Sequence, residues 1–485
     1  MTEQFPGAVL DILDAAGGRP VFEHAGREVS GARLLGMVRS AVNGLRQHGV
    51  GPGDGVAMLL GVGPGAFAAI IAAHVVGARV VGVRPGLTAR QQDHVLRDAD
   101  ATVTDRPGAH GTPAGPVIAL DDLLATADDG TRPKVLARPG DIARLLHTSG
   151  STGLPKACAQ TYAAMTAGWA HWPDAWPPAV RELAGRLDRF LVFGTLASQV
   201  MMEYGLLALA AGGTLVTADP PDFPDALVRH RASASVITVA RLTKLVAAQC
   251  ASPVDLGGLR ALMVSGSPLE PGRLREATEV LGPVVFHGYG QTETGMISMA
   301  APDEPPGSLG VPPVELEIRD ASGRPVPYGS DGELFVRTPS QSSGYWHEPA
   351  LTAEVFSDGW VRTRDLGRLD ASGRLWLTGR IRDVIIVNAN VYYAGPVERL
   401  LAGHPSVAEA YVVAVPDDST GEAVHAFVVP AAGHTPDLGE LRARVAEGLG
   451  EACAPARLTL IGEVPLTAAG KPDKRRLVDG SRTRP

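Results

Sequence analysis

The chain has 485 residues, of which 45% are apolar and 20% are charged, a balance that is ordinary for a soluble globular protein. Its length exceeds what one compact core accommodates, so two or more domains are expected. The net charge of −8 gives no general attraction to nucleic acid or to an anionic membrane. Three cysteines without a CxxC pair and an N-terminus without a basic signal segment predict a cytoplasmic protein that has neither a disulfide framework nor a zinc site.

The first three hundred residues alternate between helix-like and strand-like segments, which is the pattern of an α/β architecture. Apolar residues at helical spacing predict a helix over Ala32–His48, and Val56–Leu60 is expected to be a buried strand. The apolar stretch Ala66–Val83 contains His74 and Arg79, so it predicts a buried helix followed by a strand and not a membrane span. A second set comprises a strand at Gly213–Thr217, a helix at Asp225–His230 and a strand at Ser235–Val239.

Beyond these segments the pattern changes twice. Short strands with Gly, Pro and Asp turns between Val314 and Leu377 predict a small barrel-like sheet. The last hundred residues predict a compact α+β unit, with strands at Tyr411–Val415 and Ala426–Val429 and a helix at Leu438–Leu449. The predicted fold is therefore α/β, with a large domain of two α/β subdomains and a small β-barrel-like subdomain, followed by a small α+β domain at the C-terminus.

The most informative motif is the glycine- and hydroxyl-rich run from His147 to Lys156, which follows the apolar segment Ile142–Leu146. Glycines let the backbone turn its N–H groups inward, the hydroxyls add donors, and Lys156 supplies a mobile positive charge. Such a loop suits a polyphosphate, although Pro155 occupies the place where a Walker A loop needs glycine. The expected phosphate ligands are Thr148, Ser149, Gly150, Ser151, Thr152, Gly153 and Lys156.

Three further segments follow in a recognisable order. They are His287–Gly295, then Trp360–Gly367 with Leu375–Arg380, and finally a loop that ends at Lys471 near the C-terminus. Together with the loop before them they resemble the adenylate-forming superfamily, which includes acyl-CoA synthetases, peptide-synthetase adenylation domains and luciferases. The likeness extends from about Val56 to Lys471.

The resemblance implies a large ATP- and substrate-binding domain over residues 1–378, a hinge at 379–383 that contains Arg382, and a small domain over 384–485. It also implies catalysis by Lys471, with Thr292 reaching the α-phosphate of ATP and Glu293 holding Mg²⁺. In such enzymes a carboxylate attacks the α-phosphorus and pyrophosphate leaves, so the site must neutralise two anions and hold them in line.

The resemblance implies one set of residues for the nucleotide and one for the acid, and Gly266 belongs to both. Asp365 would accept both ribose hydroxyls, and Arg380 would assist at the ribose or phosphate side. The remaining nucleotide contacts are Gly266, Ser267, Pro268, Tyr289, Gly290 and Gln291. The residues expected around the acid are Ser198, Gln199, Met201, Gly266, His287 and Gly288.

The chain departs from the superfamily at a few positions. Arg364 stands where a glycine usually precedes the ribose-binding carboxylate, and Ala389 aligns with a glycine that lines the pantetheine tunnel. The segment Gly194–Met201 has no histidine, which many acyl-CoA synthetases carry there, and no aspartate to hold the ammonium group of an amino acid. These features favour a small aryl or arylacrylic acid and leave CoA, the phosphopantetheine thiol of a separate carrier protein, or an amine open as the acceptor.

Two other functions are kept as alternatives. A few relatives activate an inorganic oxyanion, so ATP-dependent activation of nitrite to diazotise an arylamine is one of them. The segment Gly61–Ala66 formally matches the GxGxxA fingerprint of an NAD(P)-dependent dehydrogenase, but Arg84-Pro85 follows the next strand where an acidic residue is needed. No nucleic-acid or membrane partner is expected, and the oligomeric state is left open, with a homodimer among the options.

Overall fold

The computed structural model describes residues 3–84, 87–106, 115–148, 154–218, 221–381, 384–387, 390–417, 421–467 and 471–482. The chain divides into two compact units. Unit 1 comprises residues 1–266, 277–303 and 337–361, and unit 2 comprises residues 267–276, 304–336 and 362–485. Each unit has its own sheets.

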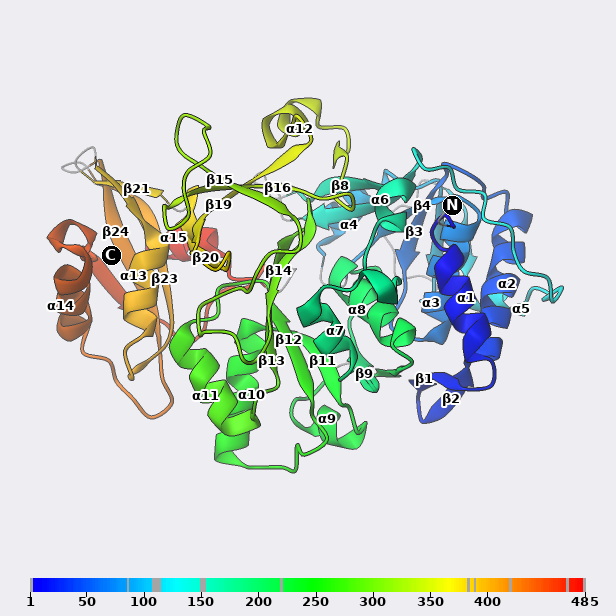
Figure 1. Ribbon diagram of the computed structural model, residues 1–485, viewed down its shortest axis with the longest axis horizontal. Coiled ribbons are helices and arrows are strands. Elements are labelled where there is room, and N and C mark those ends of the chain that lie inside the picture. The colour runs from blue at the N-terminus through cyan, green and yellow to red at the C-terminus, as the bar shows by residue number, and fades with distance from the viewer. Residues whose placement is uncertain are drawn as a thin grey trace. The chain divides into compact units, whose positions relative to one another are not determined.

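The first sheet of unit 1 has seven strands in the order β17-β8-β7-β4-β3-β5-β6 (Figure 1). The strands from β7 to β6 run parallel, whereas β8 and β17 are antiparallel additions at one edge. Its strands are β3 (Gly55–Leu59), β4 (Arg79–Gly82), β5 (Ala101–Thr104), β6 (Val117–Ala119), β7 (Ile142–Thr148), β8 (Lys156–Thr161) and β17 (Gly344–Tyr345). The helices of this part are α2 (Gly31–Gln47), α3 (Pro64–Val75), α4 (Ala89–Leu96), α5 (Leu120–Ala125) and α6 (Tyr162–Thr166).

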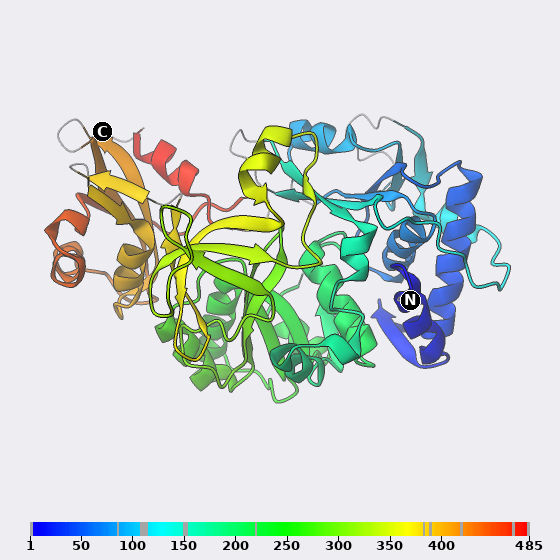
Figure 2. The ribbon, with the colours of Figure 1, turned by 45° about the horizontal axis from the view of Figure 1, so that its top comes forward.

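The second sheet of unit 1 has eight strands in the order β14-β13-β12-β11-β9-β10-β1-β2. Only its outermost pairs, β13 with β14 and β1 with β2, are antiparallel. Its strands are β1 (Pro20–His24), β2 (Arg27–Ser30), β9 (Arg189–Val192), β10 (Thr214–Thr217), β11 (Ala234–Thr238), β12 (Ala261–Ser265), β13 (Val285–Gln291) and β14 (Gly295–Ala300). The accompanying helices are α1 (Gly7–Ala16), α7 (Pro178–Ala184), α8 (Gln199–Ala210), α9 (Asp225–Arg229) and α10 (Val239–Ala251), and α1 lies beside α2 (Figure 2).

Unit 2 contains two smaller sheets. In the first, β16 lies between β15 and β19, and β20 pairs with β19; the second has the order β22-β21-β24-β23, with β25 against β24. The first is built from β15 (Glu315–Arg319), β16 (Gly332–Arg337), β19 (Trp360–Leu369) and β20 (Leu375–Arg380). The second is built from β21 (Val384–Val387), β22 (Asn390–Tyr393), β23 (Val407–Asp417), β24 (Gly421–Pro430) and β25 (Arg457–Leu460), with helices α13 (Ala394–Ala402), α14 (Leu438–Leu449) and α15 (Lys474–Arg482).

The predicted α/β fold class is confirmed, and so are most of its elements. The helix predicted over Ala32–His48 is α2, which begins after Ser30, whose side chain accepts a hydrogen bond from the Arg33 N–H as an N-cap. Strand β13 continues through the motif to Gln291, where pairing with β14 keeps the chain extended. Among the described residues no helix is both long and apolar enough to cross a membrane.

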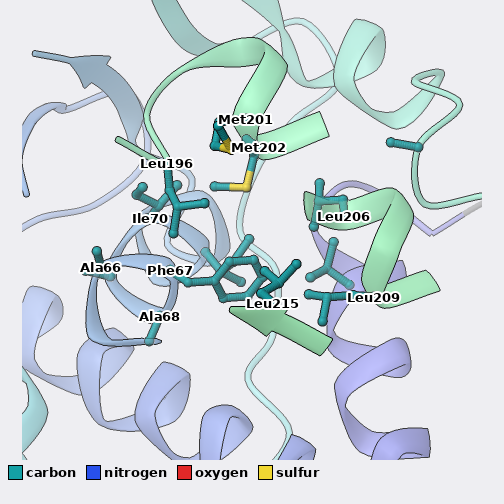
Figure 3. Close-up of a cluster of buried hydrophobic side chains, with 14 of the residues drawn as sticks. Ala66, Phe67, Ala68, Ile70, Leu196, Met201, Met202, Leu206, Leu209 and Leu215 are labelled. Atoms are coloured by element: carbon teal, nitrogen blue, oxygen red, sulfur yellow. The ribbon is translucent and has the colours of Figure 1, made fainter. Parts of the chain in front are cut away.

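The core of unit 1 forms where α3 and α8 pack together with β10 (Figure 3). Helix α3 is apolar on all sides, as expected for a helix that is buried all round. Phe67 lies at the centre of this cluster with 0% exposure, and Leu209 from α8 and Leu215 from β10 belong to the same cluster.

Phe67→Ala is expected to lower the free energy of unfolding by about 3–5 kcal/mol, because the lost ring leaves a cavity that its neighbours fill only in part. Phe67→Leu, the matched control, should cost less, since most of the apolar volume remains. Urea denaturation of both variants measures the difference. A loss below about 1 kcal/mol for the alanine variant would contradict the central place of this ring.

Candidate active site

An acidic turn joins β13 to β14 and carries Glu293 at its tip. Tyr345 donates a hydrogen bond from its hydroxyl to Oε1 of Glu293 at 2.5 Å, and the Ser342 N–H donates to the Glu293 carbonyl at 2.8 Å. Cys158 lies opposite Tyr345 in the pairing of β17 with β8. Burial raises the pKa of the Cys158 thiol well above its usual value, and the adjacent Glu293 carboxylate raises it further. The turn is therefore fixed against the β8–β17 edge of the first sheet.

The two ends of the phosphate loop lie at the same edge. Thr148 at the end of β7 pairs with Lys156 at the start of β8, and its hydroxyl donates to the Lys156 carbonyl at 3.4 Å. Lys156 and Cys158 lie on the same face of β8, because side chains alternate along a strand. Since Cys158 interacts with Glu293, Lys156 lies on the strand face that Glu293 approaches. The predicted ligands between them, Ser149, Gly150, Ser151, Thr152 and Gly153, lie outside the described residues.

The residues implied to hold adenine lie at the carboxyl ends of the parallel strands β12 and β13. In open α/β sheets, ligands bind at this end of the strands. Strand β12 ends at Ser265, and Gly266 continues with a φ of +97°, which favours glycine. In the next strand a Cβ at Gly288 would lie 2.9 Å from the Met263 Sδ, so a larger residue there would require the Met263 side chain to move. His287 and Tyr289 are buried. In the same motif, Gly290 is exposed and Thr292 belongs to the acidic turn.

Gln291 is the last residue of this strand, and it carries a side-chain amide. Its Nε2 is buried and has no hydrogen-bond partner among the described residues. A buried donor without a partner is costly, so this amide fits a ligand that supplies an acceptor, as a nucleotide does.

Unit 2 holds the residues predicted at the ribose, at the hinge and on the C-terminal loop. Asp365 and Arg380 face each other in the pairing of β19 with β20, and Arg380 Nε lies 2.6 Å from Asp365 Oδ1. Asp365 is buried, whereas Arg380 is largely exposed. Lys471 is exposed beside the bridge of Leu466 with Pro472, where its N–H donates to the Thr467 hydroxyl at 3.2 Å. Ser267 and Pro268 follow Gly266 at the start of a loop, and Arg382 and Ala389 lie outside the described residues.

Arg364 explains one departure from the superfamily pattern. Its φ is +62°, in the left-handed region where glycine is favoured, so the backbone keeps the conformation that a glycine would supply. Arg364 therefore has a backbone conformation that favours glycine, within strand β19 and directly before Asp365.

Arg364→Gly should raise the free energy of unfolding relative to Arg364→Ala by about 1 kcal/mol, because only alanine keeps the Cβ that disfavours positive φ. Both variants lose the guanidinium, so the comparison isolates the backbone. Thermal unfolding of the pair gives the answer, and an alanine variant that is the more stable of the two would exclude backbone strain at residue 364.

Asp365→Ala is expected to weaken AMP binding by about 100-fold or more, because the carboxylate would accept from both ribose hydroxyls and hydrogen bonds to a charged group each contribute about 1.5–3 kcal/mol. Titration calorimetry with AMP and with its 2′,3′-dideoxy analogue tests the assignment to the ribose. The wild type should discriminate between the two nucleotides, and the variant should not. Equal discrimination by both proteins would place the ribose elsewhere.

A cavity of about 30 Å³ lies within unit 1. Of the residues predicted to surround the acid, Gln199 lines it, whereas Ser198, Met201, Gly266, His287 and Gly288 do not. The polar residues that sequence analysis missed here are Arg144, Gln160, His171 and Glu203. The sequence could have indicated Arg144, because a charged residue within an apolar strand is unusual. No pattern in the sequence pointed to His171 or to Tyr345, the partner of Glu293.

Family models match most of the chain. Residues 13–346 match the AMP-binding enzyme family, and residues 396–471 match the AMP-binding enzyme C-terminal domain. The chain therefore belongs to the AMP-binding enzymes, the adenylate-forming superfamily that its motifs resemble, and it is an AMP-forming ligase. The family match gives no support to the dehydrogenase alternative.

Similar proteins cover nearly the full length. The feruloyl-CoA synthase of an Amycolatopsis species is 32% identical, over 92% of this chain and 93% of that protein. The 2-succinylbenzoate–CoA ligase of Geobacillus kaustophilus is 31% identical, over 89% of each chain. Among solved structures, the amide bond synthetase McbA from Marinactinospora thermotolerans is 33% identical, with a TM-score of 0.85 over 98% of this chain and 99% of that chain.

Proposed function

We propose that the enzyme converts a small aromatic carboxylic acid and ATP into an acyl-adenylate and pyrophosphate, and then transfers the acyl group to the thiol of CoA or of a carrier protein. The observation that carries this proposal is the grouping of Lys156, Glu293 and Tyr345 at the end of the phosphate loop. The aromatic substrate is supported by the similarity to a feruloyl-CoA synthase and to a 2-succinylbenzoate–CoA ligase.

In this mechanism the chain supplies positive charge and position. Lys156 and the loop before it hold the β- and γ-phosphates, and Thr292 binds the α-phosphate through its hydroxyl. Asp365 orients the ribose, and Lys471 stabilises the charge that develops as the carboxylate attacks the α-phosphorus and pyrophosphate departs. All these residues are those that the superfamily motifs assign.

Mg²⁺ fits Glu293. The described residues contain no group of three His, Cys, Asp or Glu side chains that could hold a metal by themselves. Mg²⁺ commonly takes one or two carboxylates and completes its shell with phosphate and water oxygens. Tyr345 donates to Oε1 of Glu293 and so orients this carboxylate, and the Mg²⁺ held there would neutralise part of the charge of the triphosphate.

The hinge at residues 379–383 and the mobile domain at 384–485 belong to the same proposal. Rotation about Arg382 would exchange the adenylation step for the transfer step.

An amine acceptor is the second candidate for the transfer step. The 33% identity with an amide bond synthetase over 98% of this chain favours it. In that case the adenylate is attacked by a neutral amine nitrogen, AMP leaves, and the nitrogen loses a proton to form the amide.

Pyrophosphate release across a panel of acids tests the proposal. The panel should contain benzoic, cinnamic, short aliphatic and amino acids, and nitrite. Release with aromatic acids alone is the expected result. Mass spectrometry of reactions that also contain CoA or an amine identifies the acceptor. Release of AMP only when nitrite and an arylamine are both present would overturn the carboxylate substrate.

A further inference from the structure

The cavity of about 30 Å³ in unit 1 has a built polar wall. Gln199, Met202, Glu203 and Leu206 all line it from α8, at the spacing that places side chains on one face of a helix. Arg144 from β7 and Gln160 from β8 line it from the first sheet. The cavity therefore lies between one helix and one sheet edge of the same unit.

A continuous hydrogen-bond network holds these polar groups in place. Arg144 donates from Nη2 to Glu203 Oε1 at 3.1 Å and from Nε to Gln160 Oε1 at 2.6 Å. Gln199 donates from Nε2 to the same Glu203 oxygen at 3.1 Å, and Gln160 donates to the Ser340 carbonyl at 2.6 Å. Glu203 Oε1 therefore accepts from both Arg144 and Gln199, and these two bonds hold the carboxylate in place.

The cavity adjoins the acidic turn. Gln160 lies two residues beyond Cys158 on the same face of β8, and Cys158 contacts Glu293. Gly295, at the end of the turn, also lines the cavity, and a Cβ on it would lie 3.5 Å from Gln199 Nε2. A substrate whose carboxylate reacts beside this turn can therefore reach the cavity with its far end.

His171 provides a second acceptor. It is buried, lines the cavity, and its Nε2 has no hydrogen-bond partner among the described residues. Burial lowers the pKa of His171 to about 4, so the ring is neutral at pH 7, and the Thr166 backbone bonds the ring. A neutral ring that donates from its Nδ1–H to the Thr166 carbonyl has no proton on Nε2, so Nε2 can accept a hydrogen bond.

The charges that line the cavity and its volume limit which chemical groups can bind there. Arg144 and Glu203 form an ion pair, so their charges cancel within the cavity. A buried ammonium would lack a counter-ion of its own, which is costly, whereas a neutral hydroxyl or amine needs only acceptors. The volume of about 30 Å³ admits a substituent and not a whole ring, because one water occupies about 10–15 Å³ on this scale.

We propose that this cavity binds a neutral hydrogen-bond donor, a hydroxyl or amino substituent on the ring of the aromatic acid, through Glu203 and His171. The proposal rests on the proposed function and names its substrate class more closely. Glu203 and His171 are then the specificity-determining residues of the acid site.

Pyrophosphate release measured with benzoate, its hydroxy and amino ring isomers, and 4-(aminomethyl)benzoate tests this proposal. The wild type should show kcat/KM at least on the order of tenfold higher for one hydroxy or amino isomer than for benzoate, because an unfilled polar site rejects the unsubstituted analogue. The aminomethyl acid, which carries an ammonium, should be the poorest substrate.

His171→Phe keeps an aromatic ring and leaves the ion pair of Arg144 intact. It should reduce kcat/KM for the substituted acid about tenfold more than kcat/KM for benzoate, so the preference over benzoate falls by that factor. Glu203→Gln removes the charge that pairs with Arg144, so it should lower kcat/KM for benzoate as well as the preference, and thermal unfolding identifies a variant that fails to fold. Equal use of benzoate and the substituted acids by the wild type, or an unchanged preference in a folded His171→Phe protein, would overturn the proposal. Absence of pyrophosphate release with every acid would instead contradict the proposed function.

Discussion

Lys471→Ala is expected to lower the rate of acyl-adenylate formation on the order of 10²–10³-fold, because the proposed role of this ammonium is to stabilise charge that develops only in the transition state. ATP affinity and thermal stability should change little. Lys471 is exposed, and the contact with Thr467 uses its backbone N–H, which alanine retains. Pyrophosphate exchange measures the rate, and calorimetry measures the binding of ATP.

A second lysine of the same region provides the matched control. Lys474 is only three residues away and lies 2.9 Å from Glu398, so Lys474→Ala removes the same charge from a structural ion pair. That variant should keep the wild-type exchange rate. Activity within a few-fold of wild type in Lys471→Ala, or equal losses in both variants, would remove Lys471 from the chemical step.

Glu293→Gln is expected to reduce adenylation on the order of 100-fold and to raise the Mg²⁺ concentration needed for half-maximal rate. Glutamine keeps the size of the side chain and an oxygen that can accept from Tyr345, so the loss reports the missing negative charge. Rates measured over a Mg²⁺ titration give both quantities.

Tyr345→Phe tests the position of the Glu293 carboxylate without changing its charge. It keeps the Glu293 carboxylate and removes the hydroxyl that bonds it at 2.5 Å, so a smaller loss is expected with less change in metal dependence. Lys156→Ala should weaken ATP binding much more than AMP binding, because the proposed role of its charge is to hold the β- and γ-phosphates. An unaltered Mg²⁺ dependence in Glu293→Gln would exclude this carboxylate from the metal site.

Local patterns in the sequence were sufficient for the fold and the family. Helix α14 was predicted over the same residues, Leu438–Leu449, that the structure shows, because both of its ends are encoded locally. Asp437 caps the first turn by accepting from the Gly439 and Glu440 N–H groups, and Gly450 ends the helix with a φ of +92°. The motif order likewise identified the superfamily, which the family models confirm.

Features that depend on contacts between distant segments could not be predicted. Tyr345 meets Glu293 only because β17 pairs with β8, far from it in sequence. Glu203 is an ordinary helical residue until Arg144 and Gln199 close on it, and His171 gains importance only through burial. The positive φ of Arg364 was hidden for a different reason, since an arginine gives no local indication of a left-handed backbone.

The most direct test of the central claim is exchange of radiolabelled pyrophosphate into ATP with each acid of the panel in turn, with Mg²⁺ present and no acceptor added. Exchange reports reversible formation of the enzyme-bound adenylate and requires neither CoA nor an amine. Exchange that depends on an aromatic carboxylic acid, and that is lost in Lys471→Ala, is the predicted result. Exchange that is absent with every carboxylic acid, or that appears with nitrite alone, would contradict the assignment of this enzyme as an aromatic acid ligase.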